Sequence, residues 1–358
     1  MHLKDDEYFL KLALKQAKIN KGFCHPNPSV GSLLVDKNKF ILAEGYHHGP
    51  GLPHAEIEVL KQIDFKASSD TTLYVTLEPC CHWGRTPPCV DAIIKSGIKR
   101  VVYAYQDPNP IVAGKGIEML EKAGIQCDYI KLKSIDTFYH SYHHWQKTKL
   151  PFVTAKIALS LNAAIADAHG NPVQITGKKL AIFTHQSRKS ADAILTTSDT
   201  IIHDDPQLNV RIKNRVLAKP IYMLDSRLQL PLTAKIFKTA QSITVFHGKN
   251  ISMLKREQLI GLNVRCIELE STVHGLNLQQ AIALIGQDGI HDLWIEAGGK
   301  CFASLVHDKL LQRAYIYISL RWLKHGKIAF PMGIALDKMS QNITWRQFGN
   351  DVLCDIRF

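Results

Sequence analysis

Strand-like and helix-like segments alternate along most of this sequence, and this alternation restricts the fold more than any other feature. The strand-like segments are short and rich in Val, Leu, Ile and Tyr, whereas the helix-like ones repeat apolar residues every three to four positions. In the first part, helices are expected at 5–18, 54–63, 88–95 and 116–123, and strands at 30–35, 40–43, 72–77 and 100–105. Such alternation predicts a sheet covered by helices, an α/β layered domain.

A second series of the same kind begins after residue 150. The stretch 140–149 before it is polar and aromatic, lacks clear periodicity, and is followed by Pro151. For 358 residues without an internal repeat, we therefore predict two different domains, 1–147 and 148–358. In the second, strands are expected at 152–161, 193–196, 221–224, 243–246, 264–269, 293–295, 314–320 and 351–358, and helices at 178–190, 276–285 and 301–308.

Composition excludes several classes of protein. With 46% hydrophobic and 21% charged residues, the chain is typical of a globular protein and unlike a disordered or collagen-like one. No run of about 18 apolar residues is present, so no transmembrane helix is expected. Residues 1–7 are acidic and lack the apolar core of a signal peptide, which predicts a cytoplasmic protein without membrane partners.

The net charge of +12, from 44 Lys and Arg against 32 Asp and Glu, suits anionic partners such as phosphorylated metabolites or dinucleotides. Solubility alone also explains such a charge. The basic residues are spread along the chain, which argues against a nucleic-acid surface. Eight cysteines in a cytoplasmic chain do not indicate a disulfide framework. Five of them are isolated and are expected to be buried thiols, but Cys80, Cys81 and Cys89 cluster near histidines.

This cluster predicts a catalytic zinc site. His54 begins a predicted helix, Cys80 follows a predicted strand, and Cys89 begins the next helix. The order matches the H-x-E, P-C and second Cys of zinc deaminases. Zinc prefers tetrahedral nitrogen and sulfur ligands, and a catalytic site combines three of them with one water. We therefore predict one zinc ion per chain, bound by His54, Cys80 and Cys89.

Glu56 is the predicted catalytic residue of this site. It lies two residues after His54, where it can reach the metal-bound water without binding the metal. Water whose pKa is lowered toward neutrality is the nucleophile, and Glu56 moves its proton.

Two neighbouring residues are rival ligands. The usual short motif is P-C-x-x-C, whereas eight residues separate Cys80 from Cys89 here. Cys81 follows Cys80 on a turning chain and is expected to be a packed thiol, while His82 is better placed for substrate than for metal.

Four segments of the first half resemble those of one enzyme family. They are HPNPSVG at 25–31, HAE at 54–56, TLEPCCHWGRTPPC at 76–89 and QDPNP at 106–110. Together they closely resemble the bifunctional riboflavin-biosynthesis deaminase/reductases. The resemblance implies a cytidine-deaminase-like αβα domain that hydrolyses the ring amino group of 2,5-diamino-6-ribosylamino-4(3H)-pyrimidinone 5′-phosphate. It also implies that the base and phosphate are held by Asn27, His47, His82 and Arg85.

The second half resembles the reductase domain of the same family. Matching residues include Lys156, Arg188, ADAIL at 191–195, DDPQL at 204–208 and IEAGG at 295–299. The resemblance implies a dihydrofolate-reductase-like α/β fold and hydride transfer from NADPH to the ribosyl C1′ of 5-amino-6-(5-phosphoribosylamino)uracil, giving a ribityl chain. The paired glycines after a strand also suit a phosphate at a helix N-terminus.

The resemblance further implies two sets of reductase residues. By position, the cofactor is bound by Ala158, Gln174, Thr200, Asp204, Ser226, Gly298, Gly299, Lys300 and Cys301. By position, the substrate is bound by Lys156, Pro172, Arg188, Leu208, Arg211 and Glu296.

The chain departs from the family at several reductase positions. Where the family has S-L-D-G, residues 160–163 read S-L-N-A, which removes a charge and places an alanine at a position suited to positive φ. Pro172 and Gln174 stand where the family has the Ser and Trp of S-x-W-I-T, and the stretch 314–329 lacks the family's A-P-x-L-L-G. We therefore expect retained NADPH binding and slow hydride transfer.

Three functions remain open at this point. The first is a two-step enzyme, and the second is a deaminase whose degenerate reductase domain serves only oligomerisation. The third is a nucleic-acid deaminase or nucleic-acid-binding protein, which the basic charge and the zinc motif favour. It lacks a concentrated basic or aromatic surface for a single strand and leaves the second domain unexplained. The partners we expect are phosphorylated pyrimidine intermediates and further copies of this chain in a homo-oligomer, a dimer or higher.

Overall fold

The computed structural model describes residues 3–63, 71–84, 86–110, 112–273, 275–330, 333–334, 336 and 342–358. The chain divides into two compact units, Met1–Lys149 and Leu150–Phe358. This division falls two residues after the boundary expected from the sequence. Within the described ranges, no helix combines the length and apolar character needed to cross a membrane.

The N-terminal unit contains a five-stranded sheet in the order β2-β1-β3-β4-β5. The bounds are β1 Gly31–Asp36, β2 Ile41–Tyr46, β3 Thr71–Val75, β4 Arg100–Tyr103 and β5 Gln126–Tyr129. Strand β1 is antiparallel to both β2 and β3, whereas β3, β4 and β5 are parallel. The carboxyl ends of β3 and β4 therefore lie at the same edge of the sheet, where the TLEPC and QDPNP segments follow.

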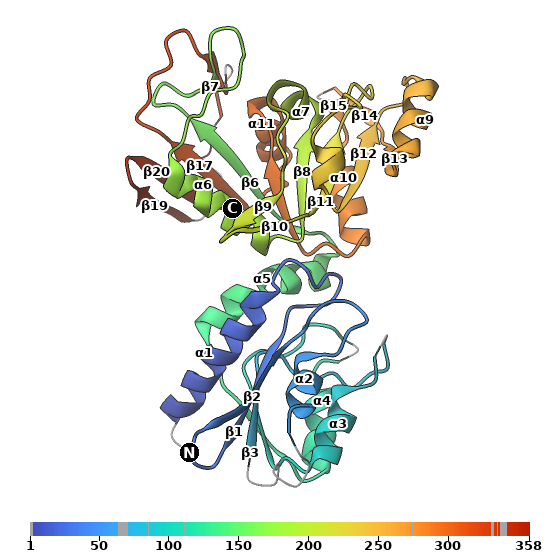
Figure 1. The fold of residues 1–358 in the computed structure, drawn as a ribbon, viewed down its shortest axis with the longest axis vertical. Helices are drawn as coiled ribbons and strands as arrows, with labels where there is room; N and C mark the ends of the chain where they lie inside the picture. The colour runs from blue at the N-terminus through green and yellow to red at the C-terminus, as the bar shows by residue number, and fades with distance from the viewer. Residues whose placement is uncertain are drawn as a thin grey trace. The chain divides into compact units, whose positions relative to one another are not determined.

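Helices cover both faces of this sheet (Figure 1). The bounds are α1 Leu3–Ile19, α2 Ala55–Leu60, α3 Cys89–Ser96, α4 Lys115–Lys122 and α5 Lys133–Thr148. One apolar cluster joins α1 and α5 to the sheet, and a second joins α2, α3 and α4 to it. The apolar side of the predicted helix 5–18 is buried, as expected from its spacing. The unit is thus an αβα sandwich.

Helix α5 was not expected from the sequence. It includes most of the polar and aromatic stretch 140–149, which lacks clear periodicity. Its buried residues include Ile135, Tyr139 and Tyr142, which are spaced by four and three residues and so share one helix face. The hydroxyl groups of the two tyrosines are satisfied inside the unit, since Tyr139 donates to Ser29 O at 3.0 Å and Tyr142 donates to Asp107 Oδ1 at 3.0 Å.

The C-terminal unit contains a nine-stranded sheet in the order β13-β12-β11-β8-β16-β6-β17-β20-β19. The bounds are β6 Phe152–Leu159, β8 Ala193–Thr197, β11 Pro220–Leu224, β12 Ser242–His247, β13 Val264–Glu268, β16 Asp292–Glu296, β17 Arg313–Ile318, β19 Asn342–Phe348 and β20 Asp351–Arg357. All pairs from β13 to β17 are parallel, while β20 is antiparallel to its two neighbours. The central strands β8, β16 and β6 are therefore buried between parallel neighbours.

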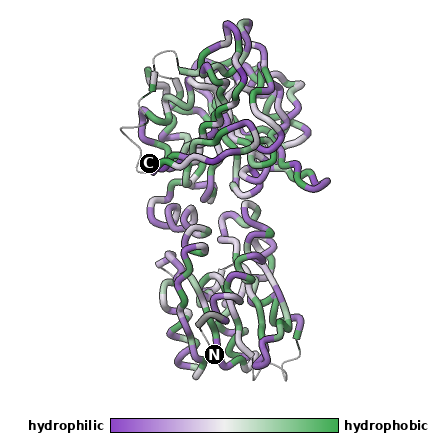
Figure 2. The backbone as a smooth tube through the Cα atoms, turned by 90° about the vertical axis from the view of Figure 1, so that its left-hand side faces the viewer, coloured by the Kyte–Doolittle hydropathy of each residue, from purple (hydrophilic) through white to green (hydrophobic). Residues whose placement is uncertain are grey.

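Helices also cover both faces of the larger sheet. One apolar cluster includes residues of α10 and α11, and the other includes residues of α6, α7, α8 and α9. The bounds are α6 Lys178–Ser190, α7 Ser198–Asp204, α8 Ile236–Thr239, α9 Met253–Gly261, α10 Leu278–Gln287 and α11 Gly299–His307. Hydrophobic residues alternate with hydrophilic ones along the chain of each unit (Figure 2), and many of the hydrophobic side chains are buried. Both units accordingly have their own core.

Several short elements and one edge strand were not expected. The short strands are β7 Ala164–Ala166, β9 Val210–Ile212, β10 Arg215–Leu217, β14 Ser271–Thr272, β15 Gly275–Leu276 and β18 Lys327–Ile328. The edge strand β19 is exposed along six of its seven residues, so it has no buried face to give it the alternating pattern of a half-buried strand.

Candidate functional site

Three side chains that are able to bind a metal ion meet in the N-terminal unit. His54 is the residue before α2, Cys80 follows β3, and Cys89 is the first residue of α3. Their ligand atoms all lie within 4.8 Å of one another, and they form the one such group of His, Cys, Asp and Glu found among the described residues. The sheet brings them together because α2 and α3 pack on the same face, next to the end of β3.

The spacing of the donor atoms fits a zinc ion. His54 Nδ1 lies 3.5 Å from Cys80 Sγ and 3.3 Å from Cys89 Sγ. Zinc bonds of about 2.0–2.1 Å to nitrogen and about 2.3 Å to sulfur place tetrahedral ligand atoms about 3.6 Å apart. The other ring nitrogen, His54 Nε2, is 3.3 Å from Thr86 Oγ1. One nitrogen and two sulfurs at this spacing leave a fourth position for water.

Electrostatics also favour a thiolate in this cluster. Hydrogen bonds from Cys89 and His54 outweigh burial and lower the pKa of Cys80 to about 4. The backbone N–H of Cys89 adds a further donor, 3.4 Å from Cys80 Sγ. A thiolate is the form of cysteine that binds a metal.

Glu56 lies in the first turn of α2, close to the three donors. Its side chain is buried, with 3% of the residue exposed, and this burial raises the pKa of Glu56 to about 7. Cys89 and His54 are among the groups that interact with its carboxylate. A carboxyl group with a pKa near neutrality is able both to accept and to return a proton.

His47 and Asn27, which the family resemblance assigns to substrate, lie beside this cluster. His47 is 1% exposed, and its ring is 5.1 Å from that of His54. His47 Nδ1 donates to Pro53 O at 3.1 Å, so its Nε2 accepts from Asn27 Nδ2 at 3.2 Å. Burial lowers the pKa of His47, which keeps the ring neutral at physiological pH. The neutral ring can hold an amide in one orientation.

The loop after Cys80 contains the remaining candidates. Cys81 is half-buried and lies outside the group of metal donors. Within the described part of this loop, His82 Nδ1 is buried without a hydrogen-bond partner, and the neighbouring Trp83 is 73% exposed. Arg85, the predicted phosphate ligand, lies outside the described residues.

In the C-terminal unit, the candidate residues gather at the carboxyl ends of the central parallel strands. Lys156 on β6 and Glu296 on β16 are register partners, and β8 on the other side of β16 leads into α7. In open α/β sheets, ligands bind at the carboxyl ends of the strands. The strand order therefore explains how residues far apart in the sequence reach one site.

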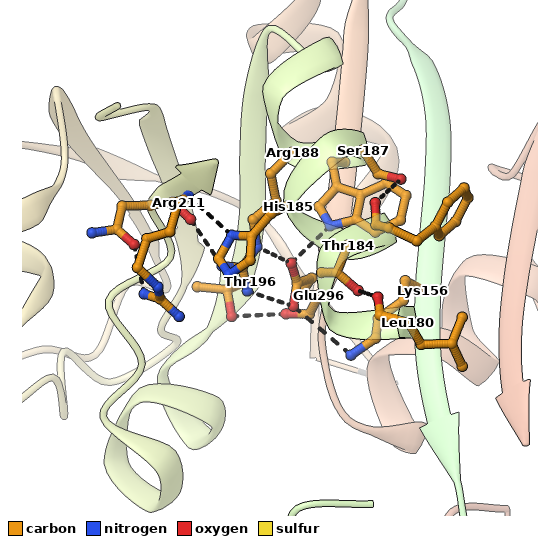
Figure 3. A network of polar contacts seen from close by, with 12 residues as sticks. Lys156, Leu180, Thr184, His185, Ser187, Arg188, Thr196, Arg211 and Glu296 are labelled. Atoms are coloured by element: carbon orange, nitrogen blue, oxygen red, sulfur yellow. Dashed lines mark hydrogen bonds and ion pairs between the residues drawn. The ribbon is translucent and has the colours of Figure 1, made fainter. Parts of the chain in front are cut away.

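Glu296 is the centre of a buried polar network (Figure 3). Arg188 on α6 donates to both of its carboxylate oxygens, and the Trp294 indole N–H donates to Oε1 at 2.8 Å. Lys156 Nζ lies 3.9 Å from Oε2. Thr196 donates to the Glu296 carbonyl oxygen at 2.8 Å. Four side chains thus fix the position of one glutamate.

This network determines the protonation of its members. Burial alone would raise the pKa of Glu296, but Arg188 and Lys156 outweigh it and lower the pKa to about 2. Burial lowers the pKa of Lys156, and the charge of Glu296 partly opposes that effect. Glu296 therefore stays ionised at neutral pH and can accept hydrogen bonds from hydroxyl groups, while Lys156 is the more easily deprotonated cation.

A cavity of about 490 Å³ lies next to this network. Its lining is Arg188, Asp205, Pro206, Gln207, Leu208, Arg211 and Lys235. Arg188 also donates to Asn209 O at 3.0 Å, so its guanidinium is largely occupied by protein acceptors. Arg211 and Lys235 are more exposed cations. Sequence reasoning missed Lys235, which follows no motif and reaches the cavity from the residue before α8.

The paired glycines have different surroundings. Strand β16 ends at Glu296, Gly298 caps α11, and Gly299 is its first residue. A Cβ on Gly298 would meet nothing within 4 Å, so its backbone faces open space that a phosphate could occupy. A Cβ on Gly299 would lie 1.9 Å from Ala329 O, so this glycine is required by a close approach of the chain itself.

The other predicted cofactor residues lie on the strand ends or near them. Ala158 is on β6, Thr200 and Asp204 are on α7, Ser226 follows β11, and Lys300 and Cys301 are in the first turn of α11. Pro172 and Gln174 lie in an exposed loop between β7 and α6, where Gln174 Nε2 donates to Thr176 O at 3.2 Å.

The departure at residues 160–163 has its own set of contacts. Asn162 accepts a hydrogen bond from Leu323 N at 3.0 Å and donates one to Leu323 O at 2.9 Å. An aspartate could make only the first of these contacts. Asn162 therefore ties the turn after β6 to the segment after β17.

Ala163 has φ 59°, in the left-handed region that favours glycine. We predict that Ala163→Gly stabilises the C-terminal unit by about 1 kcal/mol, because glycine adopts this conformation without the steric penalty. Ala181→Gly, inside α6, is the matched control and should destabilise by about 0.5–1 kcal/mol. Urea unfolding of the full chain measures both, and a destabilised Ala163→Gly variant would show that the strain is absent.

Each of the two units matches a known protein family. Residues 151–353 match the RibD C-terminal domain family, and residues 3–105 match the zinc-binding region of cytidine and deoxycytidylate deaminases. The riboflavin biosynthesis protein RibD of Aquifex aeolicus is 37% identical over 333 residues, which cover 92% of this chain and 91% of that protein. RibD of Haemophilus influenzae is 35% identical over 365 residues, covering 97% and 96%.

Solved structures agree over the whole chain. RibD from Acinetobacter baumannii superposes with a TM-score of 0.86 at 32% identity and covers 99% of both chains. A diaminohydroxyphosphoribosylaminopyrimidine deaminase/5-amino-6-(5-phosphoribosylamino)uracil reductase from Thermotoga maritima gives 0.84 at 28% identity, covering 100% of this chain and 99% of that one. These matches confirm the predicted fold class, a cytidine-deaminase-like unit followed by a dihydrofolate-reductase-like unit. The chain belongs to the RibD family, the bifunctional deaminase/reductases of riboflavin biosynthesis.

Proposed function

We propose that this chain deaminates 2,5-diamino-6-ribosylamino-4(3H)-pyrimidinone 5′-phosphate in its N-terminal unit. It then reduces the ribosyl chain of the resulting 5-amino-6-(5-phosphoribosylamino)uracil with NADPH in its C-terminal unit. The observation that carries the proposal is the group of one imidazole nitrogen and two thiol sulfurs beside a buried glutamate, in a chain that matches the family over nearly its full length.

In the deaminase site, His54, Cys80 and Cys89 hold one zinc ion. When bound, zinc supplies Lewis acidity, which makes water a nucleophile near neutral pH. Glu56 takes a proton from the water that adds to the ring carbon and returns it to the leaving ammonia. His47 and Asn27 orient the base through their hydrogen-bonded pair, and His82 and Arg85 complete the contacts to the nucleotide.

In the reductase site, the cavity beside Glu296 binds the phosphorylated substrate. Arg211 contacts the phosphate, with Arg188, Leu208 and Pro172 as further contacts. Glu296 accepts a hydrogen bond from a ribose hydroxyl, because its carboxylate stays ionised, and Lys156 lies beside it on β6. NADPH supplies the hydride when bound. Its contacts are assigned to Ala158, Gln174, Thr200, Asp204, Ser226, Gly298, Gly299, Lys300 and Cys301.

Metal analysis of single variants tests the ligand set. We expect Cys89→Ala to lose zinc, because two remaining ligands do not hold the ion at a three-ligand site. Cys81→Ser should keep one zinc per chain, because Cys81 lies outside the donor group. The opposite pattern, with zinc retained in Cys89→Ala and lost in Cys81→Ser, would exchange their roles.

A second candidate, deaminase activity alone, is favoured by the exposed Gln174 and Pro172, which offer no aromatic face for the nicotinamide. For the two-step function we expect NADPH binding with slow hydride transfer. A poorly oriented nicotinamide ring lowers the fraction of bound cofactor in a reactive geometry more than it lowers the binding affinity. Gln174→Trp should raise the single-turnover rate. Calorimetric titration with NADPH and single-turnover absorbance with the deaminated intermediate measure the two quantities. Absence of NADPH binding at millimolar concentration would support the deaminase-only function.

A further inference from the structure

Glu78 makes a buried contact with a segment of the chain that carries no proposed zinc ligand. It lies two residues before Cys80, and only 2% of the residue is exposed. Its Oε2 accepts hydrogen bonds from the backbone N–H of Asp107 at 3.2 Å and of Gly114 at 3.1 Å. Its own backbone N–H donates to Tyr105 O at 2.9 Å. Glu78 therefore attaches the end of β3 to the chain that follows β4.

A close backbone approach fixes the next residue against the same segment. A Cβ on Gly116, in the first turn of α4, would lie 2.2 Å from Pro79 O. Only glycine allows the helix to come this close to the Pro79 carbonyl. Asp107, Gly114 and Gly116 thus contact the two residues that precede Cys80.

Cys80 is held on its other side by α3. Its carbonyl oxygen accepts from Val90 N at 3.2 Å, and its sulfur accepts from Cys89 N at 3.4 Å. Cys80 is therefore fixed from two sides. It contacts α3 directly, and the residues before it are bonded through Glu78 to the segment after β4. The bonds through Glu78 also give a role to the QDPNP motif, which the proposed zinc chemistry does not use.

We propose that Glu78 is a positioning residue for the zinc site. By binding the amides of Asp107 and Gly114, its carboxylate holds Cys80 at the distance from His54 and Cys89 that the metal requires. This inference rests on the proposed ligand set. Without the carboxylate, the buried N–H of Asp107 and the partly buried N–H of Gly114 lose their acceptor, and an unsatisfied buried donor is costly. Groups that orient metal ligands typically contribute about 10–100-fold to metal affinity.

Cobalt(II) binding to the full chain tests the proposal. The affinity comes from competition with a chelator, and the visible absorption bands report the geometry of the thiolate site. We expect Glu78→Ala to weaken cobalt binding by about 10–100-fold and to shift the bands. Glu78→Gln keeps an oxygen acceptor for both amides and should restore binding close to that of the wild type. Glu118→Ala, at an exposed position of α4, is the control and should change neither readout.

A folded Glu78→Ala variant with wild-type affinity and spectrum would overturn the proposal, even if its stability is lower. If that variant does not fold, Glu78→Asp decides in the same way, because its carboxylate is one methylene too short to reach both amides. Weaker cobalt binding by Glu78→Asp supports the proposal, and unchanged binding overturns it. A wild-type chain that binds no cobalt contradicts the ligand set instead, so the two failures are distinguishable.

Discussion

Replacing Glu56 by glutamine is expected to lower the deamination rate by about 10²–10⁴-fold while zinc content and folding stay near those of the wild type. Glutamine has nearly the same shape, but it cannot accept and return a proton at neutral pH. The measurement is ammonia release from the diaminopyrimidine phosphate, together with metal analysis of the same preparation.

Glu58→Gln is the matched control for this variant. Glu58 lies on the same helix, but its side chain is partly exposed and its ion-pair partners are His48 and Lys61. It should deaminate at the wild-type rate. Turnover by Glu56→Gln within a few-fold of the wild type would remove Glu56 from the mechanism.

Replacing Arg188 by methionine is expected to destabilise the C-terminal unit by about 3 kcal/mol. Removing one partner of a buried ion pair typically costs about 3–5 kcal/mol, and Lys156 and Trp294 still contact Glu296 in this variant, which favours the lower end. Urea unfolding of the full chain measures the change. The relevant transition is the one that zinc removal does not shift, because the proposed zinc donors lie in the N-terminal unit.

Arg265→Met makes the same substitution at a more exposed ion pair. Arg265 Nη1 is 2.9 Å from Asp288 Oδ1, and half of the arginine side chain is exposed. Surface pairs contribute about 0–1 kcal/mol, so this variant should unfold close to the wild type. Equal destabilisation of both variants would show that the buried pair of Arg188 and Glu296 contributes no more to the free energy of unfolding than a surface pair does.

Much of the fold could be predicted from the sequence because burial imposes a periodicity on it. Helix α6 lies at the predicted residues 178–190, and strands such as β8 and β11 are buried almost throughout. Strand β19 was not predicted, because its residues are mostly exposed and lack the alternation of buried and exposed positions. Helix α5 was not predicted because its buried face includes tyrosines whose hydroxyl groups bond inside the protein, so the stretch is polar and aromatic and lacks a clear apolar periodicity.

The two sites differed in how much could be predicted. The predicted zinc donors lie in short local motifs, and the structure brings His54, Cys80 and Cys89 together. Their assignment as ligands stays a prediction until metal is measured. The pairing of Arg188 with Glu296 joins residues 108 positions apart, and no local motif indicates it. Trp294 was missed, although its spacing of two residues from Glu296 places both on one face of β16.

The central claim is that one chain performs both steps, and a single incubation tests it most directly. The purified protein is given the diaminopyrimidine phosphate with and without NADPH, and the products are identified by mass spectrometry. We expect the deaminated ribosyl compound to accumulate without NADPH, and to be converted, slowly, into the ribityl compound when NADPH is present. Ammonia release without any ribityl product in the presence of NADPH would contradict the claim and leave a deaminase with an inactive second unit.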